Sequence, residues 1–258
     1  MTASVAYHLQ EDGGHGGKRQ EMDQLLVALD VDTRGRALEL ANLLRGTVGG
    51  FKIGSRLFTS EGPSLVSMLV DRGDRVFLDL KYHDIPSVVA QGVRAAARLG
   101  TWMLTVHATG GRAMLVAAAD AARQSDRPPI VVGVTVLTSF DDAELARIGV
   151  TRPLPAQVES LAELAVEAGL DGVVASPLEV ERLRARIGPA PTIVTPGIRG
   201  GGAGAQGADD QVRTLGPRDA LSAGATYLVI GRPIIEAPDP LASARAIARQ
   251  LDESPPCV

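Results

Sequence analysis

Short apolar runs alternate along this chain with longer segments in which Ala, Leu and Arg are mixed. The apolar runs are nearly continuous, which is typical of parallel strands buried on both faces. The pattern predicts strands at residues 25–31, 48–53, 75–80, 102–107, 130–137, 172–175, 192–195 and 227–230. We therefore expect a parallel sheet.

The segments between those runs have the apolar spacing of amphipathic helices, and several end at a Gly that stops the helix. Clear examples are residues 36–45, 88–99, 110–123, 158–168 and 178–187. Eight strands with eight helices in about 230 residues match an α/β protein with the (β/α)8 TIM barrel fold. A doubly wound open sheet is the alternative, but no G-x-G-x-x-G motif follows the first strand.

The two ends of the chain lack this alternation. Residues 1–23 show no apolar periodicity and contain four Gly within five positions, so we expect a disordered or loosely packed head. Residues 253–258, which read ESPPCV, are expected to form a frayed tail. Residues 24–252 then form a single barrel domain.

Composition narrows the class of protein. The chain has 258 residues, a formal net charge of −4 and one cysteine, Cys257. The charge argues against a nucleic-acid binder, and a single cysteine provides neither disulfides nor a thiolate metal site. No apolar run approaches the ~18 residues of a membrane span. No signal-peptide pattern is visible at the N-terminus, so we expect a cytoplasmic protein.

Lysine is rare in this chain: only three of the 26 basic residues are Lys, at positions 18, 52 and 81. Arg keeps its proton near neutral pH and presents a wide fork, whereas Lys is a compact charge whose pKa shifts readily. Because Lys18 lies in the Gly-rich head, Lys52 and Lys81 are the first candidates for chemistry. The alternative is that they persist by chance or in a structural ion pair.

Charged residues stand at the ends of three successive predicted strands. Asp30 ends the first strand, Lys52 the second, and Asp79 and Lys81 the third. Active sites of (β/α)8 barrels form at these C-terminal strand ends, where unpaired charges are costly. Asp79 and Lys81 are two residues apart and so point to the same side of a strand. Lys52, Asp79, Lys81 and Asp84 could then form a chain of alternating charges in which carboxylates hold the cations; a structural ion-pair network is the alternative.

The last two strand ends indicate a phosphate site. Six Gly lie between positions 197 and 207, in a long loop of the kind that often acts as a lid. The eighth strand ends in VIGRP, which places Gly231 and Arg232 in the loop where such barrels usually bind phosphate. Arg199 and Arg232 could clamp a phosphate, with Gly231 allowing close backbone approach. The alternative is a Gly-rich linker with Arg232 as a surface cation.

Eight short motifs occur within residues 25–235. They are ALD ending at Asp30, FKIG around Lys52, DLKYHDIP from Asp79, HATGG from His107, TVLTS from Thr135, TPGIR from Thr195, DQVR from Asp210 and VIGRP from Val229. In this order they resemble the orotidine 5′-phosphate decarboxylase family. The D-x-K-x-x-D pattern alone is shared with a wider suprafamily, whereas DLKYHDIP with TVLTS and TPGIR is specific to the family.

The resemblance implies a homodimeric (β/α)8 carboxy-lyase with sites at the subunit interface and with no cofactor and no metal. Such an enzyme converts orotidine 5′-phosphate to UMP and CO2, the last step of UMP biosynthesis. Asp30 and Lys52 would hold the ribose hydroxyls. Asp79 would lie beside the substrate carboxylate, Lys81 would deliver the proton, and Asp84 would reach in from the other subunit.

The resemblance also assigns substrate-binding residues in the second half of the barrel. Thr138 would read the pyrimidine amide edge, and Pro196 ends the seventh strand beside the site. Arg199, Gln211 and Arg232 would close over the phosphate and base, with the Gly231 backbone at the phosphate. Gln206, in GAQG, is an alternative to Gln211.

Two segments depart from the family pattern. One is the lid, which is several residues longer than in some relatives and contains two glutamines. The other follows Lys81. The family commonly reads DIPNTV, in which the Thr contacts ribose across the dimer interface, but this chain reads DIPSVV. Val88 cannot donate that hydrogen bond, so ribose binding is expected to be weaker or rerouted through Ser87.

Two other functions remain open. A magnesium-dependent sugar-phosphate decarboxylase or aldolase shares the pattern of Asp79, Lys81 and Asp84 but needs a metal carboxylate set. A catalytically silent phospho-ligand-binding barrel would bind nucleotide without turnover. His107 and His83 are most simply interpreted as packing or hydrogen-bonding residues at the barrel mouth.

Overall fold

The computed structural model, which describes residues 23–198 and 215–252, is a closed barrel of eight parallel strands. Each strand pairs with the next, and β8 returns to β1. The strands are β1 (Leu25–Ala28), β2 (Gly50–Gly54), β3 (Val76–Tyr82), β4 (Met103–His107), β5 (Ile130–Val134), β6 (Gly172–Val174), β7 (Thr192–Thr195) and β8 (Tyr227–Ile230). The predicted (β/α)8 barrel is therefore confirmed.

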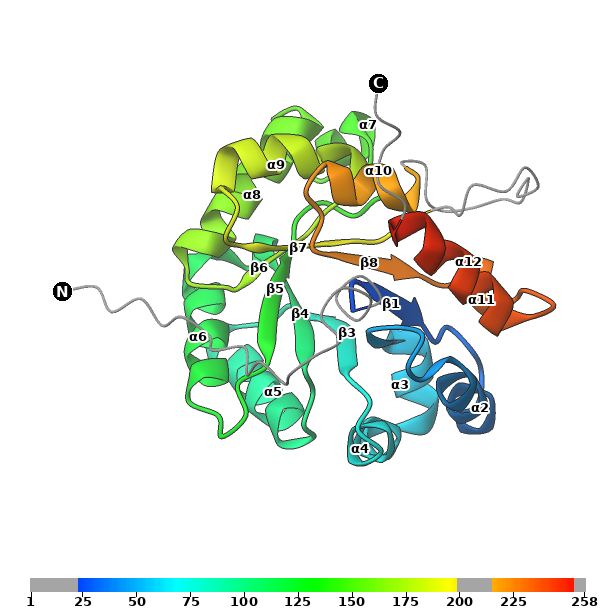
Figure 1. Cartoon of the computed structure of the whole chain (residues 1–258). Coiled ribbons are helices and arrows are strands. Elements are labelled where there is room, and N and C mark those ends of the chain that lie inside the picture. The colour runs from blue at the N-terminus through cyan, green and yellow to red at the C-terminus, as the bar shows by residue number, and fades with distance from the viewer. Residues whose placement is uncertain (1–22, 199–214, 253–258) are drawn as a thin grey trace, which may run out of the picture.

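Helices surround the strands on the outside of the barrel (Figure 1). They are α2 (Arg34–Leu44), α3 (Ser55–Glu61), α4 (Pro63–Asp71), α5 (Pro86–Arg98), α6 (Gly111–Arg123), α7 (Asp142–Arg147), α8 (Leu154–Glu167), α9 (Val180–Ile187), α10 (Pro217–Ser222), α11 (Arg232–Ile235) and α12 (Pro240–Asp252). Short 3-10 turns occupy η1 (Ala108–Gly110) and η2 (Pro177–Glu179). Within the described residues, no helix is long and apolar enough to cross a membrane.

All eight predicted strands are present, but five of them end at a different residue from the predicted one, and the difference is largest at β1, β3 and β5. β1 ends at Ala28 rather than at residue 31. β5 ends at Val134 rather than at residue 137, because its partner β6 ends at Val174, whose carbonyl accepts a hydrogen bond from the Thr135 amide at 3.2 Å. β3 continues to Tyr82, which pairs with Val106 of β4 after a register shift that begins at Leu78. The predicted head and tail fall almost entirely on residues 1–22 and 253–258, which lie outside the described residues.

The core has two layers that follow from the alternation of side chains along each strand. A small cluster fills the barrel interior: Leu26, Ala28, Phe77, Met103, Val132, Val194 and Val229. The alternate strand residues, such as Leu25 and Val27, pack outward against the helices. This parity decides which residues reach the mouth, because positions two residues beyond an inner residue point the same way.

Aromatic side chains fill the N-terminal end of the barrel. The Trp102 and Tyr227 rings meet edge to face with their centroids 5.2 Å apart. The Arg75 guanidinium lies over the Trp102 ring, 5.5 Å from its centroid. These residues stand at or just before the starts of β4, β8 and β3, opposite the end that carries Asp30 and Lys52.

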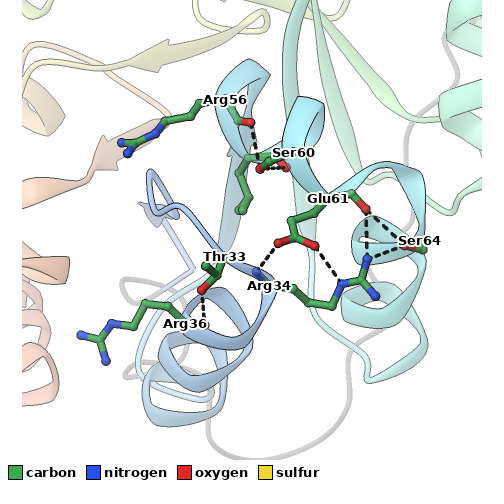
Figure 2. A network of polar contacts seen from close by, with 8 residues as sticks. Thr33, Arg34, Arg36, Arg56, Ser60, Glu61 and Ser64 are labelled. Atoms are coloured by element: carbon green, nitrogen blue, oxygen red, sulfur yellow. Dashed lines mark hydrogen bonds and ion pairs between the residues drawn. The ribbon is translucent and has the colours of Figure 1, made fainter.

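A polar network fixes the loop between β1 and α2 (Figure 2). Thr33 caps α2 by accepting a hydrogen bond from the Arg36 amide at 3.3 Å. The Arg34 amide donates to Glu61 Oε1 at 2.9 Å, and its guanidinium donates to the Glu61 carbonyl and Ser64 Oγ, both at 3.1 Å. The loop that begins at Asp30 is thereby anchored to α3 and α4.

Candidate active site

Four charged side chains from the first three strands meet at the C-terminal mouth of the barrel. Asp30 lies two residues beyond the inner residue Ala28 of β1, and Asp79 lies two residues beyond Phe77 of β3. Lys52 stands between Phe51 and Ile53, which pack outward, so its side chain points inward. The strand alternation therefore aims these groups at one place.

The ammonium and carboxylate groups alternate in a chain. Lys52 Nζ donates to Asp30 Oδ1 at 3.1 Å and lies 3.9 Å from Asp79 Oδ2. Lys81 Nζ donates to the same Asp79 oxygen at 2.8 Å. Asp79 and Lys52 are well buried, with 14% and 12% of their side chains exposed, whereas Lys81 and Asp30 are more open to solvent. Three of the four residues of the predicted charge chain, Lys52, Asp79 and Lys81, thus form ion pairs, and Asp30 joins them.

Asp84, the remaining member of the predicted chain, lies apart from it. Its carboxylate accepts a hydrogen bond from the Ile85 amide at 2.6 Å. Within the described residues of one chain, Asp84 forms no ion pair, and its side chain is exposed. The chain therefore presents Asp84 outward, just before α5.

Sequence reasoning missed Thr105, a fully buried residue in β4. Its Oγ1 donates to Asp79 Oδ1 at 3.0 Å and accepts a hydrogen bond from the Lys81 amide at 2.8 Å. It follows the inner residue Met103 by two positions and so faces the barrel interior below the charges. The available signal was a hydroxyl residue in the middle of an otherwise apolar buried strand.

The Lys81 backbone is held in an unusual conformation. Its φ is +52°, and it is the only non-glycine residue with positive φ within the described chain. The left-handed region costs an L-residue about 1–2 kcal/mol, so neighbouring contacts must hold it. It falls inside the stretch from Leu78 to Tyr82 where the pairing of β3 with β4 shifts register.

Two histidines lie next to the charged chain. The His83 and His107 rings are 5.3 Å apart and tilted by 40°. Partial burial lowers the pKa of His107, and the nearby His83 and Lys81 lower it further, against an opposing effect of Asp79. His107 is therefore neutral at physiological pH, which agrees with its interpretation as a packing residue.

The groups predicted to bind base and phosphate lie at the ends of β5, β7 and β8. Thr138 is half-buried in the turn after β5, and Pro196 is half-buried directly after β7. Gly231 follows β8, and a Cβ built on it would lie 3.3 Å from the Ala28 Cβ and 3.7 Å from Asp30 Oδ2. Gly231 thus lets the end of β8 approach the charged chain closely, and exposed Arg232 begins α11 there.

Three predicted residues, Arg199, Gln206 and Gln211, lie outside the described residues. The chain on either side of them is described, and Ile198 and Leu215 form an isolated parallel bridge. Their predicted contacts with phosphate and base remain predictions.

Lysine ammonium groups hold the two carboxylates at the mouth. Asp30 Oδ1 accepts a hydrogen bond from Lys52, and Asp79 Oδ2 accepts one from Lys81. Within the described residues, no group of three or more His, Cys, Asp and Glu side chains is placed to hold a metal ion. The arrangement can supply a fixed positive charge and a proton at Lys81, next to a carboxylate that holds it in place.

Comparison with known proteins gives one consistent answer. Residues 23–247 match the model of the Orotidine 5′-phosphate decarboxylase / HUMPS family. An orotidine 5′-phosphate decarboxylase of Moorella thermoacetica is 50% identical over 236 residues, covering 89% of this chain and 92% of the relative. One of Saccharophagus degradans is 47% identical over 228 residues, covering 88% and 94%. A solved structure of the enzyme from Lactobacillus acidophilus, 36% identical, superposes with a TM-score of 0.78 over 89% of this chain and 99% of that one.

Proposed function

The chain belongs to the orotidine 5′-phosphate decarboxylase / HUMPS family, and we propose that it converts orotidine 5′-phosphate to UMP and CO2. The observation that carries this proposal is the chain of ion pairs from Asp30 to Lys81 at the barrel mouth. It places the only two lysines of the described residues next to each other where a barrel of this fold performs its chemistry. The reaction would complete UMP biosynthesis in the cytoplasm.

The difficult step is breaking the bond between C6 of the pyrimidine and its carboxylate. The electron pair of that bond remains on C6, which has no neighbouring carbonyl to delocalise it, so the barrier is high. Stabilisation must come from charge that is in place before the reaction begins. Lys81 would supply that positive charge and then transfer a proton from Nζ to C6, giving UMP and a neutral amine that regains its proton from solvent.

Asp79 would orient this ammonium group. Its Oδ2 is 2.8 Å from Lys81 Nζ and 3.9 Å from Lys52 Nζ, so one carboxylate oxygen aligns two cations. A substrate carboxylate placed beside Asp79 would meet a like charge. Losing CO2 removes that repulsion, which makes the arrangement more favourable after the bond breaks than before it.

The remaining groups would bind the nucleotide. Asp30 and Lys52 would hold the ribose hydroxyls, and Thr138 the pyrimidine amide edge, with Pro196 beside it. Gly231, Arg232 and Arg199 would take the phosphate, while Gln211 or Gln206 would close over it. Binding energy from the phosphate, far from C6, can support the chemical step by closing the site and excluding water.

We also propose a homodimer in which Asp84 completes the partner's site. Asp84 is exposed and forms no ion pair within the described residues of its own chain. Ile85 and Val88 beside it are 63% and 45% exposed, so an apolar surface adjoins the carboxylate. A neighbouring copy that covers this surface would bring Asp84 to its own charge chain. Sedimentation velocity of the wild type and of Ile85→Asp tests this, because a monomeric wild type would contradict it.

The proposed reaction is tested by following the ultraviolet absorbance of orotidine 5′-phosphate with purified protein and excess EDTA. We expect rapid conversion to the UMP spectrum that resists the chelator. Arg186→Ala is a matched control, since Arg186 is an exposed cation in the last turn of α9 that pairs with Glu163 on α8. An inert but folded wild type would contradict the proposal, and turnover of sugar phosphates that requires magnesium would replace it with the metal-dependent alternative.

A further inference from the structure

We propose that Thr105 is a positioning residue whose single hydroxyl sets both the Asp79 carboxylate and the Lys81 main chain. The inference rests on the proposed decarboxylation and adds to it a residue that touches no substrate. Through these two contacts, Thr105 would determine where the Lys81 ammonium group stands.

The chemistry of the three groups fixes the direction of both hydrogen bonds. The Lys81 amide, 2.8 Å from Thr105 Oγ1, can only donate. The Asp79 carboxylate, 3.0 Å from the same oxygen and bound to Lys81 Nζ, can only accept when ionised. The one hydroxyl proton must therefore point to Asp79, and the hydroxyl lone pair to Lys81.

Burial makes the hydroxyl difficult to replace. Thr105 has no exposed surface, so bulk water does not reach its hydroxyl group. Without it, the Lys81 amide and Asp79 Oδ1 would both lose their partner in the barrel interior. In this irregular stretch the threonine hydroxyl therefore accepts the amide hydrogen bond that a main-chain carbonyl accepts in regular strand pairing.

The contact sits where the backbone is under strain. Lys81 has a φ of +52° within the stretch of β3 that shifts register against β4, the strand that carries Thr105. A hydrogen bond to the amide of that residue holds the conformation that turns its side chain toward Asp79. The hydroxyl links the strained backbone and the carboxylate that binds the same residue's ammonium group.

The two carboxylate oxygens of Asp79 thereby accept hydrogen bonds from different groups. Oδ1 accepts from Thr105, and Oδ2 accepts from Lys81 with Lys52 nearby. Removing the hydroxyl would free the carboxylate to rotate about its Cβ–Cγ bond. The ammonium group would then move away from the reacting carbon, which affects the chemical step more than nucleotide binding.

The test compares Thr105→Val, which keeps the shape and removes the hydroxyl, with Thr105→Ser, which keeps the hydroxyl. We expect Thr105→Val to lower kcat by about 100-fold, as for a catalytic group misplaced by an ångström. Its Kd for UMP should stay within about threefold of wild type, and Thr105→Ser should retain kcat within about threefold, because these changes leave the binding groups in place.

Thr101→Val is the matched control. Thr101 is also buried, at 2% exposure, but within the described residues its Oγ1 makes no hydrogen bond. Replacing that hydroxyl should leave kcat unchanged. If Thr105→Val fails to fold, Thr105→Ala against Thr105→Ser isolates the hydroxyl instead, since both lack the methyl group.

The outcomes separate the two proposals. A wild type that does not turn over orotidine 5′-phosphate would overturn the proposed function. If the wild type is active but Thr105→Val has the same kcat as Thr105→Ser, only the proposed role of Thr105 is overturned. Thr105→Ala takes the place of Thr105→Val in this comparison if Thr105→Val does not fold. A fall in kcat with a parallel weakening of UMP binding would also overturn it, since that pattern indicates general disruption of the site.

Discussion

The two ends of the barrel use polar and aromatic groups for different purposes. At the N-terminal end, Trp102, Tyr227 and Arg75 pack together, and Arg45 grips the buried carboxylate of Asp74 through two hydrogen bonds of 2.8 and 2.7 Å. At the C-terminal mouth, by contrast, charges are crowded within 4 Å of each other, and one of the residues that carries them, Lys81, has a strained backbone.

The difference shows how one fold divides stability and chemistry. Contacts at the N-terminal end satisfy groups that would otherwise be left unpaired between helices and strands, and so stabilise the fold. The mouth collects like and unlike charges that cost free energy to desolvate and hold. Substitutions at the mouth should therefore change activity with little loss of stability, and substitutions at the other end should do the reverse.

The largest effect is expected for Lys81→Ala. The variant lacks both the positive charge and the proton donor, so kcat should fall by at least about 10⁴-fold. UMP should still bind, and the unfolding midpoint in urea should not fall, because the change removes no core contact. Turnover close to wild type in the absorbance assay would contradict the role of Lys81.

Arg232→Ala should have the next largest effect. Loss of one charge-assisted contact to phosphate, about 1.5–3 kcal/mol, should lower kcat/KM roughly 10- to 100-fold. Separate titrations with UMP and uridine isolate the contribution of the phosphate group to binding, since only UMP binding should weaken. Equal weakening for both ligands would place Arg232 elsewhere than at the phosphate.

Asp74→Ala tests the N-terminal end. It leaves Arg45 without its partner, but Arg45 is 41% exposed and can be solvated by water, so we expect a loss of about 1–2 kcal/mol of unfolding free energy. Urea denaturation measures this loss, while kcat/KM should stay at the wild-type value. A decrease in kcat/KM without a decrease in stability would contradict the conclusion that the N-terminal end serves stability and the mouth serves activity.

The smallest effect concerns the pH dependence of stability at the mouth. Burial lowers the pKa of His107 in the folded state, so the unfolded state binds a proton more readily. Stability therefore falls as the pH drops from the ordinary histidine pKa, about 6.5, through the lower folded value. His107→Gln should flatten this decline in urea titrations between about pH 7 and pH 5, and an unchanged slope would contradict it.

The strands could be predicted because each is buried on both faces and reads as a continuous apolar run. β7 (Thr192–Thr195) and β8 (Tyr227–Ile230) were predicted with their observed bounds. The expectation failed at β5, where the apolar sequence continues past Val134 but the partner strand does not. A strand ends where its neighbouring strand no longer offers main-chain hydrogen bonds, and the sequence of one strand does not specify the length of the other.

The charged chain was also accessible from sequence. Asp30, Lys52, Asp79 and Lys81 sit at strand ends with fixed parity, and parallel strands of a barrel bring such ends together. The exclusion of Asp84 from the chain of ion pairs was not predictable. Three residues beyond Lys81 the chain has left the strand, and side-chain direction no longer follows from alternation.

The amino-acid sequence alone determined the barrel through the order of its apolar runs. The rarity of lysine and the alternation of side chains at the strand ends determined which charged residues lie at the mouth. Those are local properties, fixed by which faces must be buried. Only the folded molecule decided that Lys81 takes a left-handed conformation and that Thr105, 24 residues away in sequence, holds its amide and the Asp79 carboxylate. Both depend on the register between two strands, which arises from packing of the whole barrel and has no signature in either strand alone.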